Sequence, residues 1–176
     1  AAWSASPGPA STSRPAATSR RCSSGRPAAR STSSTARGPR SRRPIPDARA
    51  TFFTLGWIAE RYPGLVKKIV AQGHELASHG YGHLRIHEQT PAEFTQDIAR
   101  AKALLEDLSG TEVKGYRAPS FSIGPRTLWA FERIAQAGYR YSSSVYPVRH
   151  DLYGMPDAPR FAYRPRADLL EIPVTT

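Results

Sequence analysis

From Ala48 onward, short apolar runs alternate with longer stretches in which apolar residues recur at helical spacing. Such alternation is typical of β/α units that build a parallel sheet. The apolar runs predict strands at residues 50–55, 74–78, 113–116, 139–145 and 169–174. The helical pattern predicts helices at residues 57–72, 91–109 and 125–136. The sequence therefore predicts an α/β fold for residues 48–176.

The predicted helices have recognisable ends. Thr90, Pro91 and Glu93 are typical of a helix start, and Gly110 is typical of the end of the same helix. Pro63 interrupts the pattern at 57–72 and predicts the start of a second, short helix. The residues expected to face the core are Leu65, Val66, Ile69 and Val70 after Pro63, then Phe94, Ile98, Ala101, Leu105 and Leu108, and finally Leu128, Phe131 and Ile134.

Residues 1–47 differ in composition from the rest of the chain. They contain no leucine, valine, phenylalanine or lysine, and Ser, Ala, Arg, Pro, Gly and Thr make up nearly all of them. Nine arginines and a single acid, Asp47, give this segment a balance of +8 out of a formal net charge of +11. Such a segment cannot bury enough apolar surface to offset its conformational entropy, so the sequence predicts a disordered N-terminal tail.

Four interpretations of this tail are open. An arginine-rich arm could bind a polyanion through its charge, although specific nucleic-acid binding is not expected because Trp3 is its only aromatic residue. A targeting peptide is disfavoured because there is no apolar central region. A low-complexity linker is a third interpretation. We favour out-of-frame translation, because a GC-rich coding sequence in the wrong frame yields Arg, Ser, Ala and Pro at this density.

Cysteine content and apolar run length narrow the class of protein further. Cys22 is the only cysteine, so neither an intrachain disulfide nor a thiolate metal site is expected. No run approaches the ~18 apolar residues that would span a bilayer. The compartment stays open between the bacterial cytoplasm and the cell envelope, with no signal peptide visible, and the oligomeric state stays open as well.

The stretch Ser78–His83 carries the strongest chemical signal in the chain. His79 and His83 are separated by Gly80, Tyr81 and Gly82, and each glycine would cost a helix roughly 1 kcal/mol relative to alanine. A loop is therefore expected, and neutral imidazoles converging from a loop are common ligands of zinc and similar ions. A merely polar loop is the alternative. The stretch predicts a metal-binding turn after the strand at 74–78.

Several motifs of this chain resemble those of the polysaccharide deacetylases, the NodB-homology or carbohydrate esterase family 4 group. The segments that carry the resemblance are 50–53, 74–83, 116–121 and 138–141, and those typical of the branch in exopolysaccharide gene clusters are 146–154 and 170–173. The resemblance covers 48–176 and none of the preceding tail. It implies a partial, distorted (β/α) barrel, because the available strands are fewer than a complete barrel needs.

The resemblance also implies a reaction and roles for individual residues. The reaction is the metal-dependent hydrolysis of N-acetyl groups from amino sugars of a polysaccharide, with zinc as the expected metal. His79 and His83 correspond to metal ligands, and Arg117 to the arginine that orients the catalytic carboxylate. Pro119, Ser120 and Phe121 correspond to a wall of the substrate groove, with the Ser120 N–H as oxyanion donor. A surface arginine in a turn is the alternative for Arg117.

The chain departs from the family pattern in three places. No pair of carboxylates precedes Ala50, where the family has its base and third metal ligand, and Asp47 is isolated. The late general-acid histidine of the family has no counterpart, and the run 142–144 is all serine where other members keep an aspartate. We therefore expect an incomplete deacetylase domain with impaired activity.

Two other functions of the protein are compatible with the sequence. The first is a non-catalytic carbohydrate-binding remnant of the same fold, and the second is polyanion binding through the basic tail. Amide hydrolases that act on small ureides share the family's fold and are not excluded.

Three other histidines are expected to have minor roles. His74 is expected to pack or hydrogen-bond, His87 to lie near the site or on the surface, and His150 to bind substrate or act as an acid or base.

Overall fold

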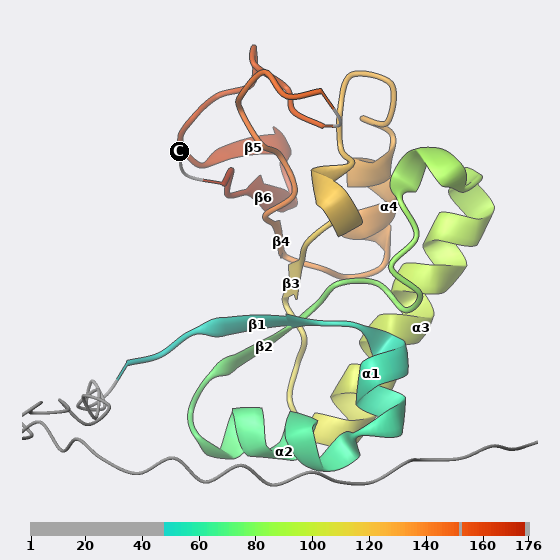
Figure 1. The fold of residues 1–176 in the computed structure, drawn as a ribbon, viewed down its shortest axis with the longest axis vertical. Helices are drawn as coiled ribbons and strands as arrows, with labels where there is room; N and C mark the ends of the chain where they lie inside the picture. Colours follow the sequence, from blue (N-terminus) through green and yellow to red (C-terminus); the bar gives the residue numbers. More distant parts are fainter. Residues whose placement is uncertain (1–47, 152, 175–176) are drawn as a thin grey trace, which may run out of the picture. The chain divides into compact units, whose positions relative to one another are not determined.

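The computed structural model describes residues 48–151 and 153–174. Within that part, six strands form one sheet in the order β1-β2-β3-β4-β6-β5 (Figure 1). Their bounds are Thr51–Thr54 (β1), Glu75–Ser78 (β2), Gly115–Tyr116 (β3), Tyr141–Ser142 (β4), Tyr163–Arg166 (β5) and Leu169–Glu171 (β6). Neighbouring strands are parallel except β5 and β6, which are antiparallel. The prediction of a disordered tail at 1–47 lies outside the described residues.

The five predicted strands are confirmed, although all are shorter than predicted, above all β3, β4 and β6. β1 and β2 pair in continuous register from Thr51 opposite Glu75 to Thr54 opposite Ser78. β2 buries Leu76, Ala77 and Ser78 in succession, as expected for a strand covered on both faces of a parallel sheet. β2 is therefore a rigid base for the residues that follow it.

The helices also form in the predicted segments, although α4 begins later than predicted. Their bounds are Gly56–Arg61 (α1), Pro63–Ala71 (α2), Pro91–Ser109 (α3) and Ala130–Gln136 (α4), with 3₁₀ turns at Ile86–Glu88 (η1) and Pro119–Phe121 (η2). Pro63 separates α1 from α2 as predicted, because it occupies the first helical position, where its missing N–H costs nothing.

Helix α3 shows how closely local sequence sets an element. Thr90 accepts a hydrogen bond from the Glu93 backbone N–H, and the Glu93 carboxylate accepts one from the Thr90 N–H at 2.8 Å. Gly110 ends the helix with a φ of 65°, a left-handed conformation that glycine adopts without a Cβ clash. The buried residues of this helix are Phe94, Ile98, Ala101 and Leu105, as predicted. Capping and periodicity together place this helix against the core.

Two predicted core residues are exposed instead. Leu128 is 48% exposed, because the helix predicted from Pro125 begins only at Ala130. The Thr127 hydroxyl accepts from the Gly124 N–H and donates to the Ser122 carbonyl, and these local bonds hold 124–129 in turns. Leu65 is also 48% exposed, because the buried face of α2 is formed by Val66 and Ile69.

Strand β5 is the element that the sequence pattern misses. It contains Pro165, which cannot donate a ladder hydrogen bond and argues against a strand in a sequence-only interpretation. β5 lies at the edge of the sheet and pairs only with β6, where a proline is tolerated.

The parallel strands bring three loops to one edge of the sheet. His79 follows β2, Arg117 follows β3 and Ser143 follows β4. The Arg117 N–H donates to the Ser78 carbonyl and the Ser143 N–H donates to the Tyr116 carbonyl, both at 2.9 Å. Residues separated by up to 64 positions in the sequence therefore meet at the carboxyl ends of adjacent strands.

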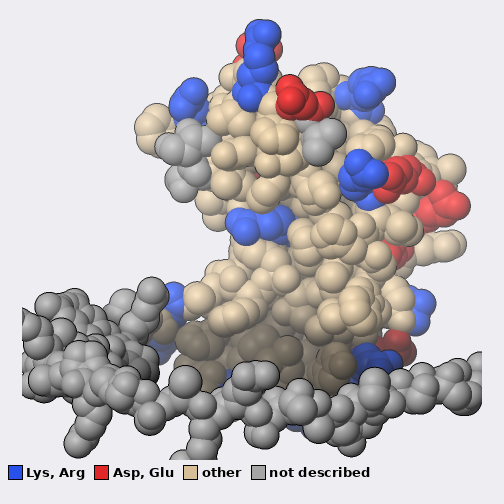
Figure 2. All heavy atoms as spheres, viewed as in Figure 1, with Lys and Arg blue, Asp and Glu red and all other residues tan. Residues whose placement is uncertain are grey.

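The surface of the described residues carries charges of both signs. On the face shown in Figure 2, Lys and Arg side chains are interspersed with Asp and Glu rather than gathered into one basic area. No helix among the described residues combines the length and apolar character needed to cross a bilayer.

Candidate active site

The histidine turn, residues 79–83, leaves the end of β2 as a sharp loop. Gly80 has a φ of 77°, and a Cβ at this position would lie 2.7 Å from the Asp97 carboxylate, so only glycine fits. His83 has a φ of 60°, an uncommon conformation for a residue with a side chain. The ring centroids of His79 and His83 are 5.0 Å apart, at an interplanar angle of 67°. The turn therefore brings the two predicted metal ligands together.

A hydrogen bond sets the protonation of His79. Its Nδ1 lies 2.7 Å from the Arg117 carbonyl oxygen, which can only accept, so Nδ1 carries the hydrogen and Nε2 is left with a lone pair. Burial lowers the pKa of His79 below its ordinary value, against the opposing effect of this hydrogen bond. The ring is therefore held in the neutral form that a metal ligand requires.

Asp97, on helix α3, holds the histidine turn by hydrogen bonds to its backbone. Its carboxylate accepts hydrogen bonds from the Tyr81 N–H at 2.8 Å and the Gly82 N–H at 3.1 Å. These two donors lie between the histidines and have no sheet partner. Sequence reasoning missed this residue, because an aspartate within a helix commonly faces solvent.

Asp97→Ala is expected to lower the free energy of unfolding by about 2 kcal/mol, because two backbone donors lose a charged acceptor. Urea denaturation measures the effect. Asp107→Ala, an exposed position of the same helix, is the matched control and should change stability by less than about 0.5 kcal/mol. Equal stabilities of the two variants would show that Asp97 does not hold the turn.

Arg117 is partly buried and tied to the loop after β4. Its Nε donates to the Ser143 carbonyl at 2.9 Å, and its Nη2 donates to the Ser143 hydroxyl at 2.7 Å. The guanidinium carbon also lies 4.1 Å from the centroid of the Phe53 ring, within range of a cation–π interaction. Arg117 thus has one fixed partner on β1 and one in the loop after β4, and differs from a surface arginine in a turn.

A buried carboxylate supports this loop. Glu171, at the end of β6, is fully buried, and its Oε1 accepts from the Ser144 and Val145 N–H groups, each at 2.8 Å. The Ser144 hydroxyl in turn accepts from the Ala118 N–H at 2.9 Å. Burial raises the pKa of Glu171, and the other oxygen, Oε2, has no hydrogen-bond partner among the described residues. Glu171 therefore positions the partners of Arg117, a role that sequence reasoning did not predict.

The predicted groove wall is a strained turn. Pro119 is buried, Ser120 is exposed and Phe121 is half-buried. Ser120 and Phe121 have φ values of 53° and 47°, in a region that residues with side chains rarely adopt. The Phe121 ring centroid is 5.8 Å from the guanidinium carbon of Arg117, which places the wall beside the Arg117 side chain.

The three remaining histidines occupy separate places. His74 precedes β2, at the opposite end of that strand from His79, and packs against Phe52 with ring centroids 5.2 Å apart. Its Nδ1 is buried and has no hydrogen-bond partner among the described residues. His87 is exposed in η1, and His150 stacks on Tyr153 with centroids 3.9 Å apart.

The two histidines of the turn supply side chains of the kind that binds metal ions. Two imidazoles at the end of one strand suit a divalent ion, and His79 and His83 are the residues that would hold it. Among residues 48–151 and 153–174, no group of three His, Cys, Asp or Glu side chains is placed to bind a metal. The donor set thus fits a metal ion but supplies fewer than the three protein ligands usual in catalytic zinc sites.

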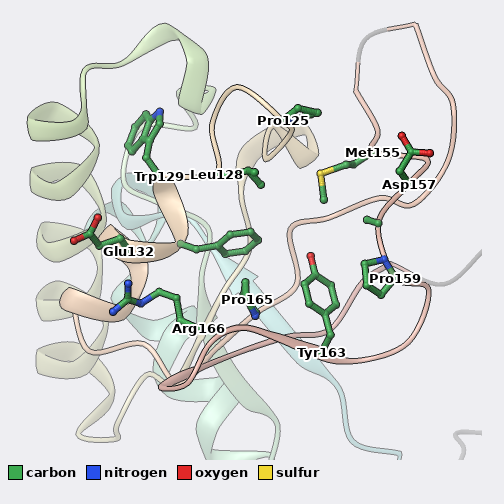
Figure 3. A pocket seen from close by; sticks show the side chains of 12 residues that line it. Pro125, Leu128, Trp129, Glu132, Met155, Asp157, Pro159, Tyr163, Pro165 and Arg166 are labelled. Atoms are coloured by element: carbon green, nitrogen blue, oxygen red, sulfur yellow. The ribbon is translucent and has the colours of Figure 1, made fainter.

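A cavity lies away from the histidine turn and Arg117. It has a volume of about 570 Å³ and lies between α4, the loop 155–159 and β5 (Figure 3). Its walls are mainly apolar, with the side chains of Leu128, Met155 and Tyr163 turned toward it. None of the predicted site residues lines it, so its size alone does not assign it to the chemistry of the histidine turn.

Comparison with known families identifies the class of protein. The model of the family described as polysaccharide deacetylase matches residues 46–142, more than half of the chain. The chain belongs to the polysaccharide deacetylase family. Residues 143–176 match a second model, described as a domain of unknown function (DUF3473).

Curated relatives of the chain include two deacetylases of different substrates. A peptidoglycan-N-acetylglucosamine deacetylase of Bacillus cereus is 34% identical over 88 residues, which cover 49% of this chain and 32% of that protein. A chitooligosaccharide deacetylase of Azorhizobium caulinodans is 32% identical over 73 residues, which cover 41% of this chain and 35% of that protein. The match thus spans about a third of the length of each relative.

Solved structures confirm the fold. A polysaccharide deacetylase homologue from Mycobacterium smegmatis superposes with a TM-score of 0.56 at 28% identity, over 71% of this chain and 40% of that chain. The allantoinase PuuE superposes with a TM-score of 0.57 at 23% identity, over 74% of this chain and 40% of that chain, and shows the fold alone. The described residues are therefore part of a NodB-type (β/α) barrel, as predicted.

Proposed function

We propose that the site catalyses metal-dependent hydrolysis of N-acetyl groups on amino sugars of a polysaccharide, with an exopolysaccharide as the substrate class. The observation that carries the proposal is the 2.7 Å hydrogen bond from His79 Nδ1 to the Arg117 carbonyl. It joins the two motifs and leaves Nε2 of His79 as a ligand atom. The named activities of the two deacetylase relatives support the same chemistry.

Each residue of the site has a part in this proposal. A divalent metal, with zinc as the first choice, would be held by His79 and His83 and would supply Lewis-acid polarisation of the acetyl carbonyl. Arg117 is a fixed cation that would orient the catalytic carboxylate of the family and keep it ionised. Ser120 is an exposed residue whose backbone N–H would donate to the oxyanion, and Pro119 and Phe121 form the wall that orients the sugar.

We also propose that the 176-residue chain is impaired as a catalyst. Two imidazoles hold a metal more weakly than three ligands do. The hydrogen bonds of Arg117 go to Ser143, with no direct bond to a carboxylate among the described residues. Within the part of the chain that the structure describes, proton transfer from water therefore lacks the base that Arg117 would orient.

Acetate release from tetra-N-acetylchitotetraose tests the proposal. With added zinc, the chain is expected to release acetate slowly but above the buffer rate, and EDTA is expected to remove that activity. The activity should return when zinc is added in excess over EDTA. Acetate release that is unchanged by EDTA would contradict a metal-dependent hydrolase.

A second candidate is a carbohydrate-binding remnant without catalysis. It is favoured by the presence of the groove wall beside an incomplete set of metal ligands. It predicts glycan binding that persists in EDTA and in His79→Ala, together with no zinc-dependent acetate release. Polyanion binding through residues 1–47 lies outside the described residues and stays a prediction, to be tested by deleting that segment and measuring the salt dependence of binding.

A further inference from the structure

Three half-buried aromatic rings meet at the start of the segment whose family has no known function. They belong to Phe121, Tyr146 and Tyr153, and we call them the aromatic platform. The ring centroids are 5.6 Å apart for Phe121 and Tyr146, 5.7 Å for Phe121 and Tyr153, and 5.6 Å for the two tyrosines. Both tyrosines lie in 143–176, the part matched to the domain of unknown function. These rings keep exposed surface, so burial in the core does not by itself explain them.

A cavity of about 310 Å³ borders the platform. Phe121 and Tyr153 line it, together with the polar side chains of Arg85, His87, Arg126 and Asp151. Its volume is at the lower end of the ~300–1,000 Å³ typical of small-molecule sites, which suits one monosaccharide unit. The cavity therefore combines aromatic surface with charged hydrogen-bonding groups in a space of about one sugar ring.

The charged groups of this cavity favour an uncharged ligand. Arg126 and Asp151 form no hydrogen bond or ion pair with any other described residue, and their opposite charges offset each other. Arg85 is already paired with Glu88 at 2.7 Å. A free guanidinium and a free carboxylate can donate to and accept from hydroxyl groups. A ligand with hydroxyls and no net charge matches this set better than an anion does.

The cavity adjoins the candidate active site through two connections. Phe121 belongs to both, because its ring also lies 5.8 Å from the guanidinium carbon of Arg117. The Ser122 hydroxyl accepts from the Ile86 N–H at 3.1 Å, which ties η1 to the turn that carries Phe121. η1 follows the histidine turn by only a few residues. A polymer bound at the histidines would therefore pass next to the cavity.

We propose that this cavity is a subsite for an uncharged pyranose, adjacent in the polymer to the acetylated sugar. A pyranose has an apolar face of C–H groups that packs on aromatic rings, and a rim of hydroxyls. Phe121 and the part of the Tyr153 ring that His150 does not cover contact the apolar face, while Arg126 and Asp151 bind the hydroxyls. This inference rests on the proposed function, and it gives residues of the segment 143–176 a role in substrate selection.

Titration of the full chain with tetra-N-acetylchitotetraose in EDTA, followed by NMR chemical shifts, tests the subsite apart from the metal. Tyr153→Ala is expected to raise the Kd at least about tenfold, because a stacking face is lost. Tyr153→Phe keeps that face and should stay within about threefold of the unmodified chain. Arg126→Ala is expected to raise the Kd several-fold. Tyr62→Ala removes an exposed tyrosine on the α1–α2 junction and should leave the Kd unchanged.

The outcomes separate this inference from the proposed function. Loss of binding in Tyr153→Ala with rescue by Tyr153→Phe supports the subsite. Equal binding by Tyr153→Ala and the unmodified chain, or no binding by the unmodified chain in EDTA, overturns it. Neither of those results affects zinc-dependent acetate release, which tests the histidine turn. Tighter binding of a uronate oligosaccharide than of the neutral probe would overturn the assignment of an uncharged sugar.

Discussion

His79→Ala is expected to lower the affinity of the protein for zinc about 100-fold, as measured by competition with a coloured chelator. The variant loses one of the two imidazoles that the turn brings together. It also loses the hydrogen bond to the Arg117 carbonyl, which fixes the tautomer of the ring. In any longer form that carries the family's carboxylates, acetate release should disappear together with the zinc.

Two further histidine variants make the zinc experiment specific. His83→Ala should lose zinc affinity to a similar extent while the metal-free stability stays unchanged, because its side chain is exposed. His87→Ala, four residues further along the chain, should bind zinc as the unmodified protein does. Full zinc affinity in either His79→Ala or His83→Ala would refute the assignment of the ligands.

Glu171→Ala is expected to lower the free energy of unfolding by about 3 kcal/mol, because two buried N–H groups lose their shared acceptor. Those donors belong to Ser144 and Val145. Glu171→Gln keeps an oxygen for both donors and is expected to cost less than about 1.5 kcal/mol at neutral pH. Urea denaturation of the two variants measures the difference. Equal losses of unfolding free energy would show that the hydrogen-bond acceptor at position 171 does not account for the stabilisation.

The pH dependence of stability gives an independent test of Glu171. Burial raises its pKa in the folded state above the unfolded value, so the folded protein holds the proton more tightly. The contribution of Glu171 protonation to the free energy of unfolding is then complete below the pKa of the unfolded state. It is lost as the pH rises through the pKa of the folded state. Because glutamine does not titrate, the stability advantage of the unmodified protein over Glu171→Gln should shrink from pH 4 to pH 7. An advantage that grows over this range would contradict the burial effect.

The elements of the fold were predictable where the signal is local. Thr90, Glu93 and Gly110 define α3 by backbone chemistry within a few residues, and the structure has that helix at the predicted place. Leu128 was wrongly assigned to the core because the side chain of Thr127 bonds the preceding turn and delays the helix. β5 was missed because the proline within it is tolerated only at a sheet edge, and edge position is a property of the whole sheet.

The candidate site was predictable for residues at the ends of neighbouring strands. His79 and Arg117 follow strands that the alternating pattern predicts, so their proximity follows from a parallel sheet. No motif or local sequence pattern marks Asp97, Ser143 or Glu171 as a residue of the site. Their roles depend on packing across 15 to 27 residues, which no local pattern reports.

The order of strands in the sheet also determines the order in which the chain can fold. From β1 to β4, each strand pairs with the one that precedes it, so these pairs can form as the chain leaves the ribosome. β5 pairs only with β6, which is made later, and the loop after β4 receives its carboxylate only when Glu171 has been synthesised. The loop after β4, which holds Arg117 through Ser143, is thus fixed last. A chain released before Glu171 would present the histidine turn without this support for Arg117.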